Sequence, residues 1–142
     1  MRILVINGPN LNLLGKRETD VYGTTSMWDV ETNLKKKFPG VMIDFFQSNS
    51  EGALIDQIHK AMDGAFDGVV INPGAYGHYS YALRDALAVL KTPVVEVHIS
   101  NVHAREEFRR HSVIAPVCAG MITGLGTTGY ELAVQYFVDS QS

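Results

Sequence analysis

The sequence predicts an α/β fold in which a five-stranded parallel sheet lies between two layers of helices. Short apolar runs rich in valine and isoleucine alternate with longer amphipathic segments, and several of the short runs end at glycine, proline or asparagine. This alternation is typical of βαβ units, whose crossover helices cover both faces of a parallel sheet. The number of strands favours a three-layer, flavodoxin-like sandwich with strand order 2-1-3-4-5.

Five segments are expected to form the strands. The first is a run of aliphatic residues that stops at Asn7, where Gly8 and Pro9 follow. The second has the weaker pattern because Asp44 interrupts it, and the fifth is short. The strands are expected at residues 3–6, 41–46, 68–72, 93–98 and 119–123.

Four segments with apolar residues at helical spacing are expected to form the main helices. The first carries an apolar stripe from Met27 to Phe38 and three lysines near its end, where cations interact favourably with the helix dipole. Met62 is expected to extend the buried stripe of the second, and Leu132 and Tyr136 to turn inward in the last, together with Val134. The helices are expected at residues 25–38, 51–62, 81–90 and 128–138.

Composition limits the class of protein. A chain of 142 residues with a formal net charge of −3 suits one domain over residues 1–142, and its weak acidity argues against a nucleic-acid partner. A single cysteine, Cys118, excludes an intramolecular disulfide. No targeting segment and no long apolar stretch is present, so we expect a cytoplasmic protein without a membrane partner.

The residues that can carry chemistry follow the first, third and fourth predicted strands. Parallel strands end at one edge of the sheet, and ligands bind there at the point where the strand order reverses. A histidine that ends a strand reading Pro-Val-Val-Glu-Val has no turn to make, which favours a functional role for His98. The loop at residues 8–23 is longer than the usual βα connection of about 2–6 residues, as lids often are.

Residues 100–111 are expected to form a short helix with Ser100 or Asn101 as its N-cap. Arg105 and Arg109 would then share one face, where they either bind a ligand or serve a structural role. A ligand for two such arginines would naturally carry a carboxylate. Metal-ligand spacings, a nucleophile elbow, a dinucleotide fingerprint and a phosphate-binding loop are absent from the sequence. The remaining chemistry is acid–base catalysis by histidine, tyrosine and arginine without a metal or cofactor.

Three blocks of sequence carry a resemblance to a known family. Residues 6–18 read Ile-Asn-Gly-Pro-Asn-Leu-Asn-Leu-Leu-Gly-Lys-Arg-Glu, and Val-Tyr-Gly follows at 21–23. Residues 71–76 read Ile-Asn-Pro-Gly-Ala-Tyr, with Ala-Leu-Arg-Asp-Ala at 82–86. Residues 96–109 read Glu-Val-His-Ile-Ser-Asn-Val-His-Ala-Arg-Glu-Glu-Phe-Arg. In this order and over nearly the whole chain, the sequence resembles type II 3-dehydroquinate dehydratase.

The resemblance implies a reversible anti elimination of water from 3-dehydroquinate, which gives 3-dehydroshikimate through an enolate. Tyr22 would be the proton acceptor, with Arg17 beside it to tune the phenol and stabilise the transition state. His98 would be the proton donor, oriented by Glu96. Asn10 would help to hold the water that stabilises the enolate.

The resemblance also implies a substrate-binding set, an assembly and the absence of a cofactor. The assembly would be a homo-oligomer, a dodecamer built from trimers, in which Asp85 is lent to the site of a neighbouring subunit. No metal or cofactor would be needed. The substrate-binding residues would be Asn72, His78, Asp85, Ile99, Ser100, Arg105 and Arg109.

Four positions depart from the common pattern of the family without touching a catalytic position: Thr19 in the lid, Gly77 and Tyr79 beside His78, and Ser50 after the second strand. Two other classes remain open at this point. A nucleotide-, flavin- or phosphate-accepting module would share the fold but needs a Ser/Thr/Gly-rich loop or acidic strand ends. An inactive binding protein would share both fold and residues, and only turnover separates it.

Overall fold

The sheet has five parallel strands in the order β2-β1-β3-β4-β5, which confirms the predicted topology. The structure is a computed structural model that describes residues 1–16 and 18–141, with residue 22 described through its backbone alone. The strands are β1 (Arg2–Asn7), β2 (Met42–Gln47), β3 (Gly68–Asn72), β4 (Val94–His98) and β5 (Gly120–Thr123).

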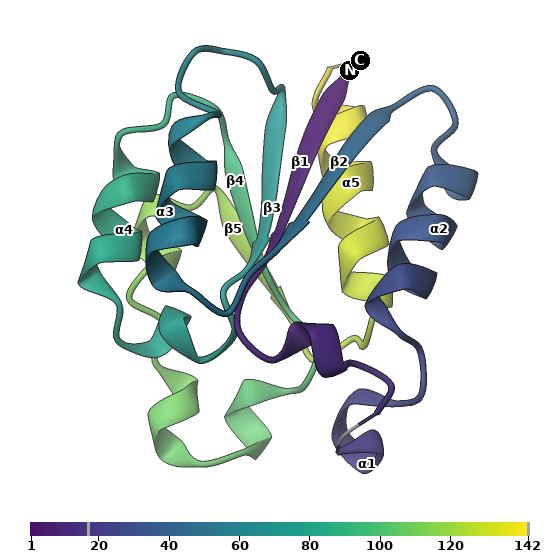
Figure 1. Cartoon of the computed structure of the whole chain (residues 1–142), viewed down its shortest axis with the longest axis vertical. Coiled ribbons are helices and arrows are strands. Elements are labelled where there is room, and N and C mark those ends of the chain that lie inside the picture. The colour runs from purple at the N-terminus through teal and green to yellow at the C-terminus, as the bar shows by residue number, and fades with distance from the viewer. Residues whose placement is uncertain (17, 142) are drawn as a thin grey trace.

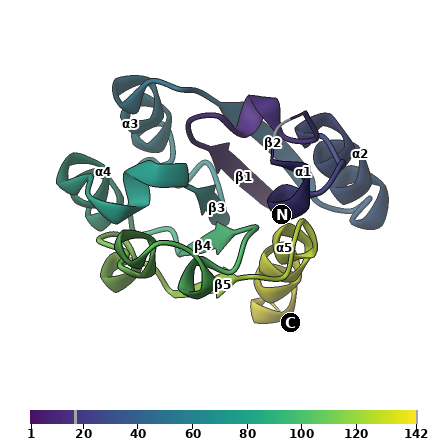
Figure 2. The same ribbon diagram turned by 90° about the horizontal axis from the view of Figure 1, so that it is seen from below.

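Helices cover both faces of this sheet and make three layers (Figures 1 and 2). On one face lie α2 (Met27–Lys37) and α5 (Thr128–Ser140); on the other lie α3 (Glu51–His59) and α4 (Tyr81–Ala88). The side chains of β1 alternate between the two cores, because successive residues of a strand point to opposite faces. Ile3 and Val5 are buried on the α2–α5 side, and Leu4 and Ile6 on the α3–α4 side, all with 0% exposure.

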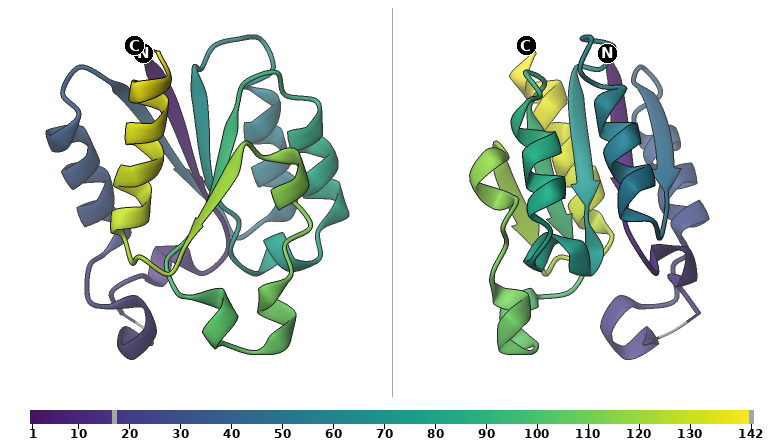
Figure 3. Two further views of the ribbon diagram at one scale, coloured as in Figure 1. Left: turned by 180° about the vertical axis from the view of Figure 1, so that it is seen from behind. Right: turned by 60° about the vertical axis from the view of Figure 1, so that its left-hand side comes forward.

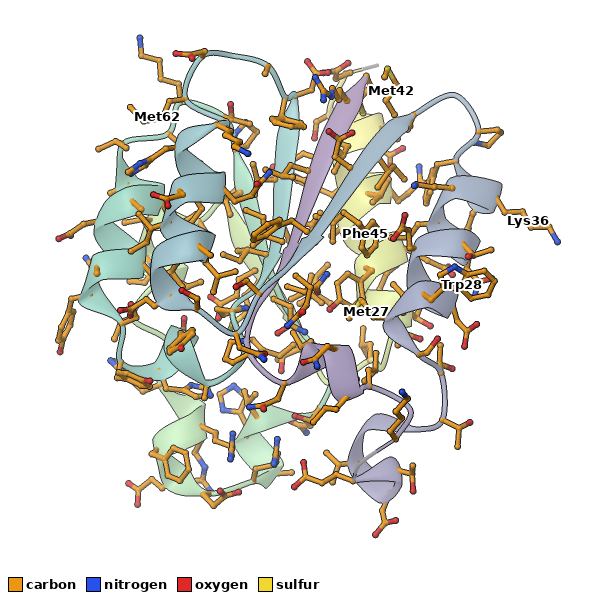
Figure 4. The ribbon with its side chains drawn as sticks, in the orientation of Figure 1. Met27, Trp28, Lys36, Met42, Phe45 and Met62 are labelled. Carbon is orange, nitrogen blue, oxygen red and sulfur yellow. The ribbon has the colours of Figure 1, made fainter. Side chains whose placement is uncertain are left out.

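Helix α2 forms for the reasons expected from its sequence. Ser26 caps it through a reciprocal pair of bonds with Asp29, at 3.0 and 3.1 Å. Its apolar stripe is buried through Val30 and Leu34. Figure 4 shows Trp28 and Lys36 on the outer side of the helix, away from the sheet.

The predicted end of α3 was wrong. The helix stops at His59, so Met62 falls beyond it and is 49% exposed. Ala61 and Phe66 fill the core instead, as the chain turns at Gly64 with a positive φ of 73°.

The predicted inward face of α5 was also wrong in part. Leu132 and Tyr136 are 43% and 48% exposed, whereas Tyr130, Val134 and Phe137 are buried. Two apolar stripes run along this helix, and each satisfies helical spacing. Packing against β3 and β4, rather than the sequence pattern, selects the stripe that faces the sheet.

The carboxyl ends of the strands carry the loops expected to form the site. Gly8 donates its backbone N–H to the carbonyl of Asn72 at 2.8 Å, so the loops after β1 and β3 are in backbone contact. A Cβ atom on Gly8 would stand 2.4 Å from the carbonyl oxygen of Pro73, which explains the glycine. Short helix α1 (Thr19–Tyr22) and the 3₁₀ helices Val102–Ala104 and Glu107–Arg110 extend beyond this edge of the sheet (Figure 3).

Candidate active site

A cavity of about 260 Å³ opens at the carboxyl edge of the sheet, between the loops that follow β1, β3 and β4. This is the switch point of the strand order, where the sequence predicts a ligand site. Most of the predicted substrate-binding residues meet here. The cavity is lined by Pro9, Asn10, Leu11, Leu14, Asn72, Gly74, Ala75, His78, His98, Ile99, Ser100, Val102, Arg105 and Arg109.

His98 ends β4 with its ring bonded to a buried carboxylate. Its Nε2 lies 2.5 Å from Oε2 of Glu96, which is 0% exposed. A carboxylate only accepts hydrogen bonds, so Nε2 carries a proton and Nδ1 is the ring nitrogen that remains for a ligand. A buried carboxylate in this position holds the ring orientation and its tautomer.

His78 lies beside His98, and its ring bonds to a backbone carbonyl rather than to a carboxylate. The two rings stack with centroids 5.8 Å apart and an interplanar angle of 17°. Its Nδ1 donates to the carbonyl of His111 at 2.9 Å, which leaves Nε2 as the acceptor of the neutral ring. Burial lowers the pKa of His78, with the charges of His98 and Arg109 adding to the shift against the His111 carbonyl. A neutral His78 can accept a hydrogen bond from a hydroxyl group of a ligand.

Asn72 is held at the floor of the cavity by a buried hydrogen-bond chain. Its Nδ2 donates to the hydroxyl of Tyr130 at 2.9 Å, and that hydroxyl donates to Oδ1 of Asn7 at 2.7 Å. Its Oδ1 accepts the backbone N–H of Gly74 at 3.2 Å. Burial raises the pKa of Tyr130, so its hydroxyl stays protonated and acts as the donor in this chain.

The two arginines reach the cavity, but not from the single helix expected over residues 100–111. The segment forms two 3₁₀ helices interrupted at Arg105 and Glu106, whose backbones are extended. Val102 and Phe108 would lie on different sides of an α-helix and give no common apolar stripe; Val102 is buried, whereas Phe108 is 59% exposed. Arg109 donates from Nε to Glu106 at 3.1 Å.

Arg105 is the better enclosed of the two arginines. Its side chain is 16% exposed, and Nη1 lies 3.4 Å from Oγ of Ser100. Asn101 caps the first 3₁₀ helix, as one of the two predicted caps, through the backbone N–H of His103 at 3.1 Å. Two guanidinium groups on one side of the cavity suit a ligand with a carboxylate or several hydroxyl oxygens.

The first part of the loop that follows β1, within residues 9–14, lines one side of the cavity. Asn10 lines the cavity in a left-handed conformation, with φ of 69°, and its backbone N–H donates to Oδ1 of Asn49 at 2.9 Å. Glu18 lies 4.0 Å from Nη2 of Arg105, which brings the loop close to the opposite wall. Arg17 and the side chain of Tyr22 lie outside the described residues; the backbone of Tyr22 ends α1.

Asp85 is the one described substrate-binding candidate away from the cavity. It is exposed on α4 and does not line the cavity of this chain. Cys118 is partly buried, and burial raises the pKa of its thiol to about 12, so the thiol stays protonated at neutral pH. Within residues 1–16 and 18–141, no group of three or more His, Cys, Asp or Glu side chains is arranged to hold a metal ion. No described helix has the length and apolarity to cross a membrane.

Sequence reasoning missed the apolar wall and one polar contact. Leu11, Leu14 and Val102 line the cavity beside the polar groups. The first two belong to the run Asn-Leu-Asn-Leu-Leu, where leucines in an otherwise polar strand-end loop are a usable signal. Ser112 donates to the carboxylate of Glu96 at 2.8 Å, and nothing in the sequence marks it.

The fold and the cavity together define a doubly wound α/β protein with a ligand site at its switch point. A sequence model of the family Dehydroquinase class II matches residues 1–138. The 3-dehydroquinate dehydratase of Bacillus licheniformis is 58% identical over 142 residues, covering 99% of this chain and 97% of the relative. That of Thermotoga neapolitana is 57% identical over 138 residues, covering 96% and 93%.

Solved structures agree with the sequence relatives. The crystal structure of type II dehydroquinase from Butyrivibrio crossotus superposes with a TM-score of 0.94 at 50% identity, covering 97% of each chain. A 3-dehydroquinate dehydratase-like protein from Bifidobacterium longum gives 0.71 at 30% identity, covering 98% of this chain and 96% of that one. The chain belongs to the class II dehydroquinase family.

Proposed function

We propose that residues 1–142 act as one catalytic domain, a hydro-lyase that converts 3-dehydroquinate to 3-dehydroshikimate by reversible anti elimination of water through an enolate. Membership of the family supports the substrate and the overall reaction. The observation that supports the chemistry best is the buried Glu96–His98 pair at the wall of a polar cavity. This step serves aromatic biosynthesis or quinate breakdown, because both routes pass through it.

His98 is the proton donor. Loss of a hydroxyl group is slow unless the departing oxygen is protonated, and an imidazolium does this near neutral pH. Glu96 keeps the proton on Nε2 and the ring fixed, so that Nδ1 delivers a proton to the leaving oxygen.

Tyr22 is the proton acceptor and Arg17 its activator. A phenol has a pKa of about 10, and a cation within about 4–6 Å can lower such a value by about 1–3 units. Both residues belong to the loop whose Glu18 lies 4.0 Å from Arg105, a residue that lines the cavity. Asn10 holds the water that stabilises the enolate.

The remaining candidates bind the substrate. Its carboxylate and hydroxyl groups are met by backbone and side-chain donors at the strand ends, by neutral His78 and by the two arginines. Asp85, exposed on α4, completes the site of a neighbouring subunit in a homododecamer of trimers. No metal or cofactor takes part, and the protein is cytoplasmic. The binding residues are Asn72, His78, Asp85, Ile99, Ser100, Arg105 and Arg109.

The test is a turnover assay that follows the ultraviolet absorbance of the conjugated enone product. The protein is expected to turn over 3-dehydroquinate, and His98→Ala to lower kcat by about 10²–10⁴-fold while substrate binding stays measurable. His59→Ala, at an exposed position on α3, is the matched control and should keep full activity. No enone from the intact protein, or full kcat in His98→Ala, would contradict the proposal. A visible flavin spectrum would support the binding-module alternative instead.

A further inference from the structure

We propose that Ser112 is a positioning residue for the proton-donating Glu96–His98 pair, an inference that rests on the proposed function. Its hydroxyl lies 2.8 Å from Oε1 and 3.0 Å from Oε2 of Glu96. Oε2 also accepts a hydrogen bond from Nε2 of His98 at 2.5 Å. Among the described residues, Ser112 is the donor to Oε1. A carboxylate with 0% exposure needs such donors to remain charged.

The direction of this hydrogen bond follows from the other bond that the hydroxyl makes. Oγ of Ser112 accepts the backbone N–H of Ala115 at 3.0 Å. A hydroxyl has one proton to donate, and the accepted N–H leaves that proton free for the carboxylate of Glu96. Ser112 is therefore a donor to Glu96 in the folded protein.

The backbone on both sides of Ser112 is fixed to the segment that carries His78. The carbonyl of His111, the preceding residue, accepts Nδ1 of His78 at 2.9 Å. The N–H of Val113, the following residue, donates to the carbonyl of Gly77 at 2.8 Å. These bonds hold the hydroxyl in place before substrate binds. The hydroxyl fixes the orientation of the Glu96 carboxylate, and the carboxylate in turn fixes the ring of His98 at the cavity.

Ser112 does not line the cavity, so its effect on catalysis should pass through Glu96 and His98 rather than through a substrate contact. Without its hydroxyl, Oε1 of a buried carboxylate loses its donor and the group can rotate about its terminal torsion. The hydrogen bond to His98 then bends or lengthens. We expect kcat to fall and KM to stay constant, because substrate contacts are unchanged while the proton donor is misaligned.

The experiment compares Ser112→Ala, Ser112→Cys and Ser112→Thr with Ser140→Ala as the exposed control on α5. Ser112→Ala should lower kcat roughly tenfold or more, as for loss of a hydrogen bond to a charged group, with KM within about twofold. The Cys variant, similar in size but a weak donor, should also lose kcat, whereas Thr should restore it. Combined with His98→Ala, the Ala substitution should cause no further loss.

Proton NMR of the His98 Nε2–H gives a readout that does not depend on turnover. A proton shared with a carboxylate across 2.5 Å resonates far downfield, and Ser112→Ala should move or broaden it while Ser140→Ala leaves it unchanged. Wild-type kcat in a folded Ala or Cys variant, or an equal further loss in the His98→Ala background, would overturn the role of Ser112. An inactive parent protein would contradict the proposed function. The role of Ser112 would still be tested by the NMR signal of the His98 Nε2–H, and an unchanged signal in Ser112→Ala would overturn it.

Discussion

The substitution Tyr130→Phe removes a single hydroxyl group, yet it should lower the free energy of unfolding by several kcal/mol. Tyr130 is 0% exposed, and its hydroxyl donates to Asn7 at 2.7 Å and accepts from Asn72 at 2.9 Å. The substitution leaves the volume of the ring in place and removes both bonds. The change in the free energy of unfolding therefore reports the contribution of these two hydrogen bonds at the cavity floor.

The magnitude follows from the groups that lose their partners. Oδ1 of Asn7 and Nδ2 of Asn72 would be buried without a hydrogen bond, each at about 1–3 kcal/mol. Within the described residues, Nδ2 of Asn7 already has no partner, so that side chain would have none at all. We expect a loss of about 3 kcal/mol, which is a fall in Tm of roughly 6–12 °C for a domain of this size.

The assay is urea unfolding at one fixed protein concentration, because association changes apparent stability. The midpoint should fall with an unchanged m-value, and KM should rise because Asn72 lines the cavity. Tyr136→Phe is the matched control: it lies on the same helix, is 48% exposed and should change stability by no more than about 0.5 kcal/mol. Equal midpoints for the two variants would refute the reasoning that the buried hydroxyl joins the two amides.

Two further outcomes are expected. Gly8→Ala should destabilise the protein by about 1–3 kcal/mol, because its Cβ would stand 2.4 Å from the carbonyl oxygen of Pro73, whereas Gly40→Ala, with nothing within 4 Å, should be neutral in the same unfolding assay. His78 should titrate below about 6.5 by NMR. Its folded pKa is lowered, so the unfolded chain takes up the proton first and stability falls as pH drops below about 6.5. The protein should lose more stability than His78→Gln between pH 7 and 5, and parallel curves would contradict the lowered pKa.

The sequence alone determines the fold class and the edge of the sheet that carries the site. Strand and helix periodicities are local, so the sequence shows them directly. A chain of βαβ units leaves few ways to arrange five parallel strands, and the order β2-β1-β3-β4-β5 is one of these few. Since parallel strands share one carboxyl edge, residues that follow different strands are brought together by topology. Asn72 and His98 could therefore be placed in one site before any contact was known.

Tertiary structure decided what depends on contacts between distant residues. The inward stripe of α5, the interrupted helix at Arg105 and the exposure of Met62 all depend on what each segment packs against. The hydroxyl of Tyr130 meets Asn7 across 123 positions of the chain, and Ser112 meets Glu96 across 16. The local sequence pattern does not predict such pairs. Each pair forms because two distant segments pack together, and the pattern of either segment would fit the fold equally well without the hydrogen bond.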